Sequence, residues 1–304
     1  MTLEKTLFIV NPAARHGETR KLVPALERVS DGVTPHEIQL SAGPRHAFDL
    51  ARTAEGFDSI VAVGGDGTAH EVLNGVMAHD EAKRPSFGIV PTGSGNDYAH
   101  TLGMSDDLAT ALQQLSTGRR RRVDLGTCNG AWFGESVSMG LDARVTVKAV
   151  ELKVTTGLSG LPLYLRALMY VLRRQYHSHH LTVQFDDEAP FETEALIIAV
   201  TNGPTYGGGF KITPDSMPHD GLFDICRIDM MPKAEAFARL PFVVLGKHTR
   251  MRPVHMRRAK RVTVVSNTPL EGQIDGEVTL ESTFDIQMVP SAMTVIVPAE
   301  ETGR

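Results

Sequence analysis

Short runs of β-branched residues alternate with helix-like apolar spacing over the first 125 residues of the chain. Such alternation is typical of a parallel sheet whose strands are connected by helices. The pattern predicts strands at Lys5–Val10, Thr34–Leu40, Ser59–Val63, Ser86–Val90 and Arg122–Leu125. It predicts helices at Arg20–Val29, Arg45–Glu55, Ala69–Met77, Asp97–Leu102 and Asp107–Leu115. We therefore expect an α/β domain over residues 1–125.

The pattern changes near Gly126, after which strand-like segments follow one another without regular helices between them. The expected strands are Ala131–Met139, Leu181–Phe185, Ala195–Thr201, Leu222–Asp229, Arg261–Ser266 and Thr283–Val289. The expected helices are Val145–Val154, Leu161–Tyr176 and Pro232–Leu245. We expect a β-rich second domain over residues 126–289. A last strand, Thr294–Val297, can pair with either domain, so residues 290–304 are candidates to join the first.

Composition excludes several classes of protein. The 304 residues carry 31 Lys and Arg against 36 Asp and Glu, a net charge of −5 that argues against general duplex binding. Two cysteines, Cys128 and Cys226, are too few for a disulfide framework or a cysteine zinc site, and a reducing compartment fits best. No stretch approaches the roughly 18 apolar residues of a spanning helix. We expect a cytoplasmic protein that binds no nucleic acid.

Three of the expected strands run directly into loops of small residues. These loops are Asn11–Gly17, Gly64–Thr68 and Pro91–Asp97. Because the carboxyl ends of parallel strands meet at one edge of a sheet, we expect all three loops at the edge where α/β proteins bind ligands.

The loop Gly64-Gly65-Asp66-Gly67-Thr68 lies between an expected strand and an expected helix. Glycine lets backbone N–H groups approach an anion closely, and the helix amino terminus adds partial positive charge, so phosphate is the expected ligand. The carboxylate of Asp66 would repel phosphate unless a divalent cation such as Mg²⁺ lay between them. The alternative is a tight turn with no ligand. Walker and dinucleotide-binding glycine motifs are absent from the sequence.

Four segments together resemble the diacylglycerol kinase catalytic-domain family, which includes bacterial diacylglycerol kinases, related lipid kinases, sphingosine kinases and ceramide kinases. The segments are Gly64–Val76, Gly88–Ala99, Pro214–Asp224 and Ile274–Glu277. The likeness covers nearly the whole chain in the right order. It implies an ATP-dependent lipid kinase, with an α/β domain similar to that of NAD kinases and phosphofructokinases, a β-sandwich domain, and an active site in the cleft between them.

The resemblance also implies roles for particular residues. Those matching nucleotide-binding positions are Asn11, Pro12, Ala13, Ala14, Arg15, Ser41, Gly65, Asp66, Gly67, Thr68, Ala69, His70, Glu71, Ser94, Asn96 and Asp97. In the second domain Met217, Asp220 and Leu222 match positions that bind a structural magnesium ion in bacterial members, two through carbonyls and Asp220 through its carboxylate. The alternative for that segment is a plain turn.

Phosphoryl transfer needs a group that takes the proton from the attacking hydroxyl. Glu277 matches the family's catalytic base, and Asp275-Gly276-Glu277 is expected to leave two carboxylates, Asp275 and Glu277, on one exposed corner. Asp66 would bridge to the active-site magnesium, with Asp97 a second candidate for the same network. A surface hairpin turn is the alternative for Asp275–Glu277.

A lipid acceptor implies contact with a membrane, and two segments are candidates. Leu158–Tyr176 is either a lipid-facing flap or a buried helix. Lys247–Arg261 contains seven Lys or Arg and no acid, so it is either an attachment surface for anionic lipid or a solvated face. We expect peripheral association with the inner face of the membrane. His177, His179 and His180 lack the neighbouring carboxylates or cysteines that a metal site would need.

Two other functions remain open. An NAD kinase shares the glycine loop but phosphorylates a soluble dinucleotide, and a nucleotide-sensing or lipid-binding module would have lost catalysis. The acceptor is taken as diacylglycerol, giving phosphatidic acid, although the sequence does not distinguish it from other hydroxylated lipids. A homodimer is an open alternative to a monomer.

Overall fold

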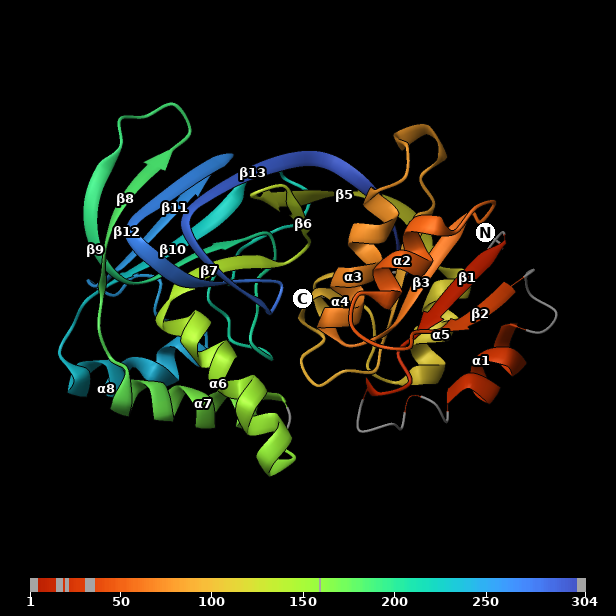
Figure 1. The fold of residues 1–304 in the computed structure, drawn as a ribbon, viewed down its shortest axis with the longest axis horizontal. Coiled ribbons are helices and arrows are strands. Elements are labelled where there is room, and N and C mark those ends of the chain that lie inside the picture. Colours follow the sequence, from red (N-terminus) through yellow and green to blue (C-terminus); the bar gives the residue numbers. More distant parts are fainter. Residues whose placement is uncertain (1–4, 15–18, 20–21, 31–35, 159, 300–304) are drawn as a thin grey trace. The chain divides into compact units, whose positions relative to one another are not determined.

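The computed structural model describes residues 5–14, 19, 22–30, 36–158 and 160–299 (Figure 1). The chain folds as two compact units. Unit 1 comprises Met1–Val123 and Ser291–Arg304, and unit 2 comprises Asp124–Pro290. Two strands, β5 (Arg119–Cys128) and β13 (Glu277–Val297), each run from one unit into the other.

Unit 1 is built on a parallel sheet. Its strands are β1 (Thr6–Val10), β2 (His36–Leu40), β3 (Ser59–Gly64) and β4 (Ser86–Pro91), in the order β2-β1-β3-β4. The end of β13 adds to β4 in parallel, with Val295 opposite Phe87. Every residue of β1, β3 and β4 is buried, as expected for the central strands of a sheet covered on both faces.

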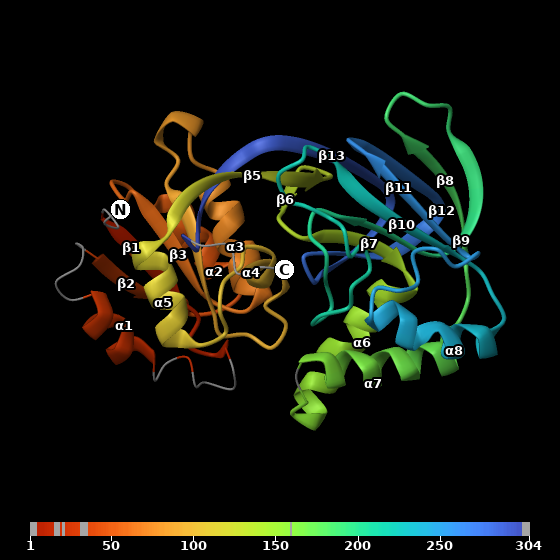
Figure 2. The same cartoon turned by 180° about the vertical axis from the view of Figure 1, so that it is seen from behind.

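Helices cover both faces of this sheet. They are α1 (Val23–Ser30), α2 (His46–Thr53), α3 (Asp66–Met77), α4 (Asp97–Thr101) and α5 (Leu108–Thr117), with a short 3₁₀ helix, η2, at Glu81–Lys83. Figure 1 shows α2 and α3 in front of the sheet, and Figure 2 shows α5 on the opposite face. The expected alternation is confirmed, although residues 20–21 and 34–35 of two expected elements lie outside the described residues.

Unit 2 is built on antiparallel strands. They are the second half of β5, β6 (Ala131–Phe133), β7 (Ser136–Gly140), β8 (His179–Phe185), β9 (Phe191–Thr201), β10 (Phe223–Asp229), β11 (Val254–Ala259), β12 (Arg261–Ile274) and the first part of β13. Neighbours follow the order β11-β10-β9-β7-β12-β13, and β8 pairs with both β9 and β12.

Several strand predictions need correction. The strand expected at Ala131–Met139 is broken at residues 134–135, where the chain turns toward Asp275. The strands expected at Arg261–Ser266 and Thr283–Val289 are parts of the much longer β12 and β13. Similarly, Arg122–Leu125 is only the middle of β5.

Three helices complete unit 2, and both views show them together on one side of its strands (Figure 1, Figure 2). They are α6 (Leu141–Thr156), α7 (Gly160–Arg174) and α8 (Lys233–Val244). The apolar face of α7 packs inward through Leu163, Ala167 and Val171. This agrees with the buried-helix alternative for that face, and contact of the segment with lipid stays a prediction. Within the part of the chain that the structure describes, none of the helices combines the length and the apolar character of a membrane-spanning segment.

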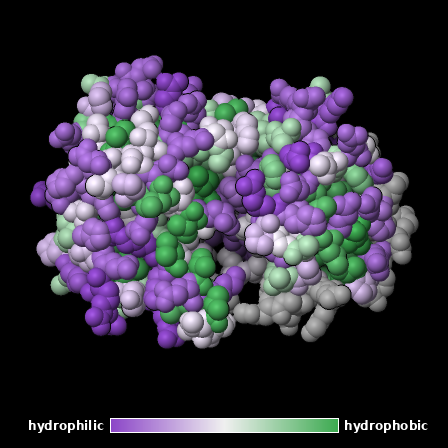
Figure 3. Space-filling model, in the orientation of Figure 1, coloured by the Kyte–Doolittle hydropathy of each residue, from purple (hydrophilic) through white to green (hydrophobic). Residues whose placement is uncertain are grey.

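Helix α6 differs from α7 because it leaves apolar side chains exposed. Val147, Val150 and Val154 have exposed fractions of 41%, 58% and 86% and share one face of the helix. Figure 3 shows hydrophobic residues at the surface along this part of unit 2.

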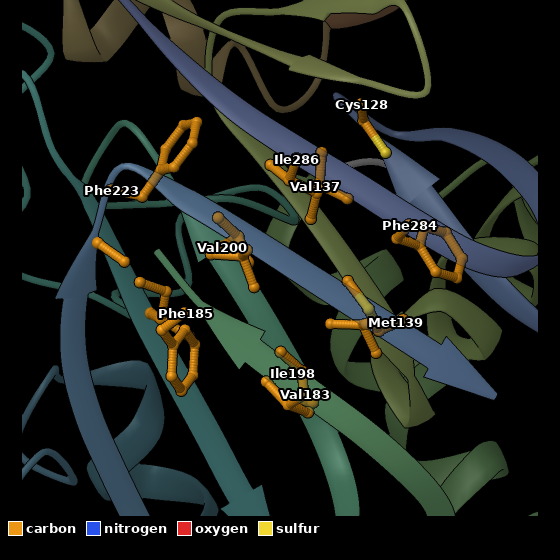
Figure 4. Packing of buried hydrophobic residues seen from close by; sticks show 14 of the residues in the cluster. Cys128, Val137, Met139, Val183, Phe185, Ile198, Val200, Phe223, Phe284 and Ile286 are labelled. Carbon is orange, nitrogen blue, oxygen red and sulfur yellow. The ribbon is translucent and has the colours of Figure 1, made fainter. Parts of the chain in front are cut away.

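The core of unit 2 follows from strand register. Val137 on β7 pairs with Val200 on β9, and Met139 pairs with Ile198. Residues paired in this way point to the same face of an antiparallel sheet, and Figure 4 shows these side chains in one cluster with those of the neighbouring strands. The rings of Phe133 and Phe223 are stacked within it, with centroids 5.6 Å apart.

Candidate active site

The three small-residue loops lie at one edge of the unit 1 sheet, as expected. Parallel register places the ends of β1, β3 and β4 side by side, with Val10 opposite Val63 and Val63 opposite Val90. The loops are also bonded to neighbouring strand ends. The Asn11 N–H donates to the Val63 carbonyl (3.0 Å) and the Thr92 N–H donates to the Gly64 carbonyl (2.8 Å).

Two glycines explain how closely the loops approach. A Cβ atom on Gly65 would lie 2.9 Å from Cα of Gly93, and a Cβ atom on Gly93 would lie 2.3 Å from Cα of Gly65. Any side chain at either position would therefore push the loops apart. Helix α3 begins directly after Gly65 with no side-chain cap, so its amino terminus places partial positive charge at this edge.

Asp66 and Asp97 bring two carboxylates to the same place. A Cβ atom on Gly95 would lie 2.6 Å from Oδ2 of Asp66 and 3.4 Å from Oδ2 of Asp97. The Asn96 N–H donates to Oδ2 of Asp66 (2.8 Å), and Oδ1 of Asn96 accepts the Gly93 N–H (2.9 Å). The loop after β4 is thus tied to the start of α3.

This pair of carboxylates fits Mg²⁺ bound together with phosphate. Magnesium usually takes one or two carboxylates and fills its remaining positions with phosphate oxygens and water. Within the described ranges, no group of three or more His, Cys, Asp or Glu side chains is arranged to hold a metal alone. Asp66 and Asp97 are the residues of unit 1 that would hold the ion.

Most of the other predicted nucleotide-binding residues lie in or beside these loops. The Asn11 amide donates to the Thr68 hydroxyl (3.0 Å) and so joins the first loop to α3. Pro12, Ala13, Ala14, Gly67 and Ser94 are at least partly exposed, whereas Ser41 and Ala69 are buried and His70 is half-buried on α3. Arg15 lies outside the described residues.

Glu71 has a different place from the rest. Its two carboxylate oxygens accept the N–H groups of Arg45 (2.8 Å) and Ala47 (3.1 Å) at the start of α2. The side chain therefore caps α2 and joins it to α3. This contact between residues more than twenty positions apart leaves no local pattern in the sequence.

The Asp275–Glu277 segment is a two-residue hairpin turn between β12 and β13. Ile274 pairs with Glu277, and Asp275 and Gly276 have φ values of 48° and 88°, typical of a type I′ turn. Glu277 is exposed. The role of Glu277 as catalytic base stays a prediction.

Asp275 is not on an exposed corner, and that expectation was wrong. Its carboxylate accepts three backbone N–H groups, from Gly134 (2.8 Å), Glu135 (2.9 Å) and Ser136 (3.0 Å). The side chain thus holds the break between β6 and β7 against the hairpin. Its partners are about 140 positions away in the sequence, so the inward direction had no local signal.

The segment expected to bind structural magnesium does not fit a ready-made metal site. The Met217 carbonyl accepts the His219 N–H (2.9 Å), and Oδ1 of Asp220 accepts the Leu222 N–H (3.1 Å). Oδ2 of Asp220 forms an ion pair with Arg258. A divalent cation would have to displace this guanidinium.

Asp124, which sequence reasoning missed, also holds this turn. It is buried, its N–H donates to the Pro218 carbonyl (2.9 Å), and its Oδ2 accepts the Gly221 N–H (2.7 Å). One feature of the sequence could have pointed to Asp124. It is an acid that directly follows the mainly basic stretch Arg119–Val123, within a segment expected to be a strand.

Unit 2 also contains a pocket that was not predicted. It holds about 910 Å³ of space free of protein atoms, part of it open to solvent. Its wall is mostly apolar and comes from α6, α7, α8, the loop around Tyr206, strands β9 and β10, and residues 248–254. Such an apolar lining suits a lipid-like molecule. The residues come from many separate segments, which is why no motif indicated the pocket.

Comparison with known proteins adds to this geometry. Residues 5–128 match the model of the diacylglycerol kinase catalytic domain. Residues 135–297, more than half of the chain, match the YegS C-terminal NAD kinase beta sandwich-like domain. The chain belongs to the diacylglycerol kinase catalytic-domain family.

Relatives of this kinase family agree with the assignment. A diacylglycerol kinase of Bacillus subtilis is 28% identical over 280 residues, 90% of each chain. The crystal structure of a diacylglycerol kinase from Bacillus anthracis has a TM-score of 0.73 at 23% identity over 98% of both chains. An NAD kinase from Archaeoglobus fulgidus in complex with ATP has a TM-score of 0.52 at 12% identity over 98% of this chain and 94% of that one. The two structures support the fold alone, and the family supports a kinase.

In this family member the basic stretch Lys247–Arg261 is partly neutralised. It includes β11, an edge strand that was not predicted because three of its six residues are basic. Arg257 pairs with Glu188, and Arg258 pairs with Asp220 and lies 3.6 Å from Asp224. The surface is thus less cationic than its composition indicates.

The histidines near residue 180 accompany a buried arginine. Arg144 donates to Glu271 (2.7 Å) and contacts His177 and His179. Burial, with the nearby Arg144 charge, lowers the pKa of His179 to about 4. A neutral His179 can accept a hydrogen bond from the guanidinium, which protonation would prevent.

Proposed function

We propose that this kinase transfers the γ-phosphate of ATP, in the presence of Mg²⁺, to the hydroxyl of a lipid, and that diacylglycerol is the acceptor, giving phosphatidic acid. The apolar pocket of unit 2 carries the lipid part of the proposal. A soluble dinucleotide needs many hydrogen-bonding partners, whereas this pocket offers very few polar groups. NAD is therefore the weaker alternative.

The proposed chemistry divides between the two units. The N–H groups at the start of α3 and the turns at Gly65 and Gly93 would bind the phosphates, and Asp66 with Asp97 would hold the metal. Bound magnesium would offset phosphate charge. Glu277 would take the proton from the lipid hydroxyl as its oxygen attacks the γ-phosphorus.

The test uses labelled ATP with two acceptors, mixed micelles containing diacylglycerol and free NAD. We expect label in the lipid and none in NAD. Glu277→Gln is expected to lower turnover by about 10²–10⁴-fold with little change in ATP affinity, because it removes a general base while preserving side-chain shape. Labelled NAD without labelled lipid would reject the proposal. ATP binding without transfer to any acceptor would indicate a non-catalytic module.

We also propose that the exposed valine face of α6 contacts the membrane, which a lipid kinase has to approach. Exposed Val147, Val150 and Val154 form an apolar stripe on this helix, and Lys153 lies beside it. Val150→Glu with Val154→Glu is expected to reduce co-sedimentation with anionic vesicles. Unchanged vesicle binding would contradict this placement.

A further inference from the structure

An acidic residue lies in the wall of the apolar pocket of unit 2. Asp142, the second residue of α6, lines the pocket among leucine, valine, isoleucine and methionine side chains. The position is costly for a carboxylate, because an apolar wall replaces none of the hydrogen bonds that water would supply. Such a residue needs a partner that the apolar wall does not provide.

Tyr206 satisfies one oxygen of this carboxylate. Its hydroxyl donates to Oδ2 of Asp142 over 2.7 Å. The other oxygen, Oδ1, is buried and has no hydrogen-bond partner among the described residues. Burial raises the pKa of Asp142 to about 6, and side-chain hydrogen bonds from Ser138 and Tyr206, with the backbone N–H of Ala143, limit this rise. The group is therefore mostly ionised above neutral pH and can accept a further hydrogen bond.

Two other ionisable side chains that line the pocket, Arg239 and His248, have partners elsewhere. Arg239 forms an ion pair with Glu235 on its own helix. His248 is fully buried, and its Nε2 contacts the Ile212 carbonyl (3.1 Å). Burial lowers the pKa of His248, which favours the neutral ring. Neither group forms a described ion pair with Asp142.

The loop that carries Tyr206 is built to hold it in place. Tyr206 and Phe210 exchange two backbone hydrogen bonds of 3.1 and 3.0 Å, and Gly207, Gly208 and Gly209 between them all have positive φ. A Cβ atom on Gly208 would lie 3.3 Å from the backbone at the start of α7. The loop is thus closed on itself and packed against α7, so the hydroxyl of Tyr206 is directed by a fixed backbone.

We propose that Asp142, oriented by Tyr206, accepts a hydrogen bond from an O–H or N–H group of the lipid that occupies this pocket. The pocket would then select a lipid with a donor group within its reach over one with a purely hydrocarbon chain there. The inference rests on the proposed lipid substrate, and it narrows that substrate to lipids that carry an O–H or N–H group within reach of Asp142. Asp142 is a specificity-determining residue in this account.

The test measures binding rather than phosphorylation. Two matched pairs of C18 lipids in detergent micelles are compared, octadecane-1,2-diol with 1,2-dimethoxyoctadecane, and octadecane-1,12-diol with 1,12-dimethoxyoctadecane. Within each pair, one member has hydroxyl donors and the other has every hydroxyl replaced by its methyl ether. We expect about a tenfold to hundredfold tighter Kd for the diol in at least one pair, the usual effect of a hydrogen bond to a buried charged group.

Two variants show whether Asp142 causes the preference. Asp142→Leu is expected to bring the two members of the pair within threefold of each other. Glu151→Leu, which removes an exposed acid on the same helix outside the pocket, is expected to keep the preference. If Asp142→Leu does not fold, as judged by circular dichroism, Asp142→Asn is used and should reduce the preference at least threefold.

Two outcomes would overturn the proposal: equal affinities within both pairs for the wild type, or a preference that survives in folded Asp142→Leu. Because binding needs neither ATP nor transfer, failure of the kinase function is distinguishable. A donor preference without lipid phosphorylation would reject the proposed function and keep this inference. Lipid phosphorylation without any donor preference would reject this inference and keep the proposed function.

Discussion

The contact between Gly65 and Gly93 gives the sharpest prediction, the effect of Gly93→Ala. The new Cβ atom would lie 2.3 Å from Cα of Gly65 and 2.7 Å from Oδ1 of Asn96, where ordinary contacts are 3.4–4 Å. The loops would have to separate by about 1 Å, at a cost of about 1–3 kcal/mol in the free energy of unfolding. The same movement is expected to weaken ATP binding at least tenfold, because the two turns would no longer approach one anion together.

Urea denaturation followed by circular dichroism measures the stability, and titration with a fluorescent ATP analogue measures the affinity. Gly43→Ala is the matched control, because nothing lies within 4 Å of a Cβ atom there and its φ is not positive. That variant should change the free energy of unfolding by less than about 0.5 kcal/mol. If Gly93→Ala matches the wild type in both measurements, the close approach of the two loops is refuted.

Three further predictions concern unit 2. Asp275→Ala should lower the free energy of unfolding by about 2–4 kcal/mol, because three N–H groups lose their acceptor; a denaturation midpoint equal to that of the wild type would contradict this. Since the pKa of His179 is lowered to about 4, folding favours its neutral form. Protonation of His179 should therefore not reduce the free energy of unfolding above pH 6.5, and this free energy should fall as the pH drops from 6.5 to 4. The fall should be at most about 1.4 kcal/mol per pH unit, and smaller because water partly screens the ring. Denaturation series across this range should show a shallower fall for His179→Gln. Mg²⁺ without nucleotide should leave the melting temperature of the wild type unchanged, because Arg258 forms an ion pair with the Asp220 carboxylate that the metal would need. In Arg258→Met the melting temperature should rise with Mg²⁺. A magnesium-induced rise in the wild type would count against this ion pair.

The sequence indicated those parts of the fold that depend on local patterns. Fully buried β-branched runs such as Ile60–Val63 have few alternatives to a central parallel strand, and the loops that follow them had to share one edge. Strand β11 was missed because an edge strand with arginines on it resembles a solvated basic loop. The direction in which a single side chain points could not be predicted in the same way. The hydrogen-bond partners of Asp275 and Glu71, for example, are set by tertiary structure.

The candidate site divides in the same way. A glycine loop that contains an acid is a contiguous motif that indicates phosphate binding. Asp66 and Asp97 could therefore be chosen from the sequence as candidate magnesium ligands. The apolar pocket has no contiguous motif, since its wall is assembled from three helices and several strand ends. The pairing of Asp142 with Tyr206, 64 positions apart, becomes visible only once the chain is folded.

The division of the chain between the units bears on the order in which the protein folds during synthesis. Unit 2 is one uninterrupted stretch, whereas unit 1 lacks a strand until residues 291–297 have been made and Val295 can pair with Phe87. Likewise, Arg84 cannot donate its hydrogen bond to the Ala292 carbonyl (3.1 Å) until Ala292 has been synthesised. On a ribosome the domain that begins first would therefore be completed last, with the exposed edge of β4 left open to mispairing until translation reaches the final strand.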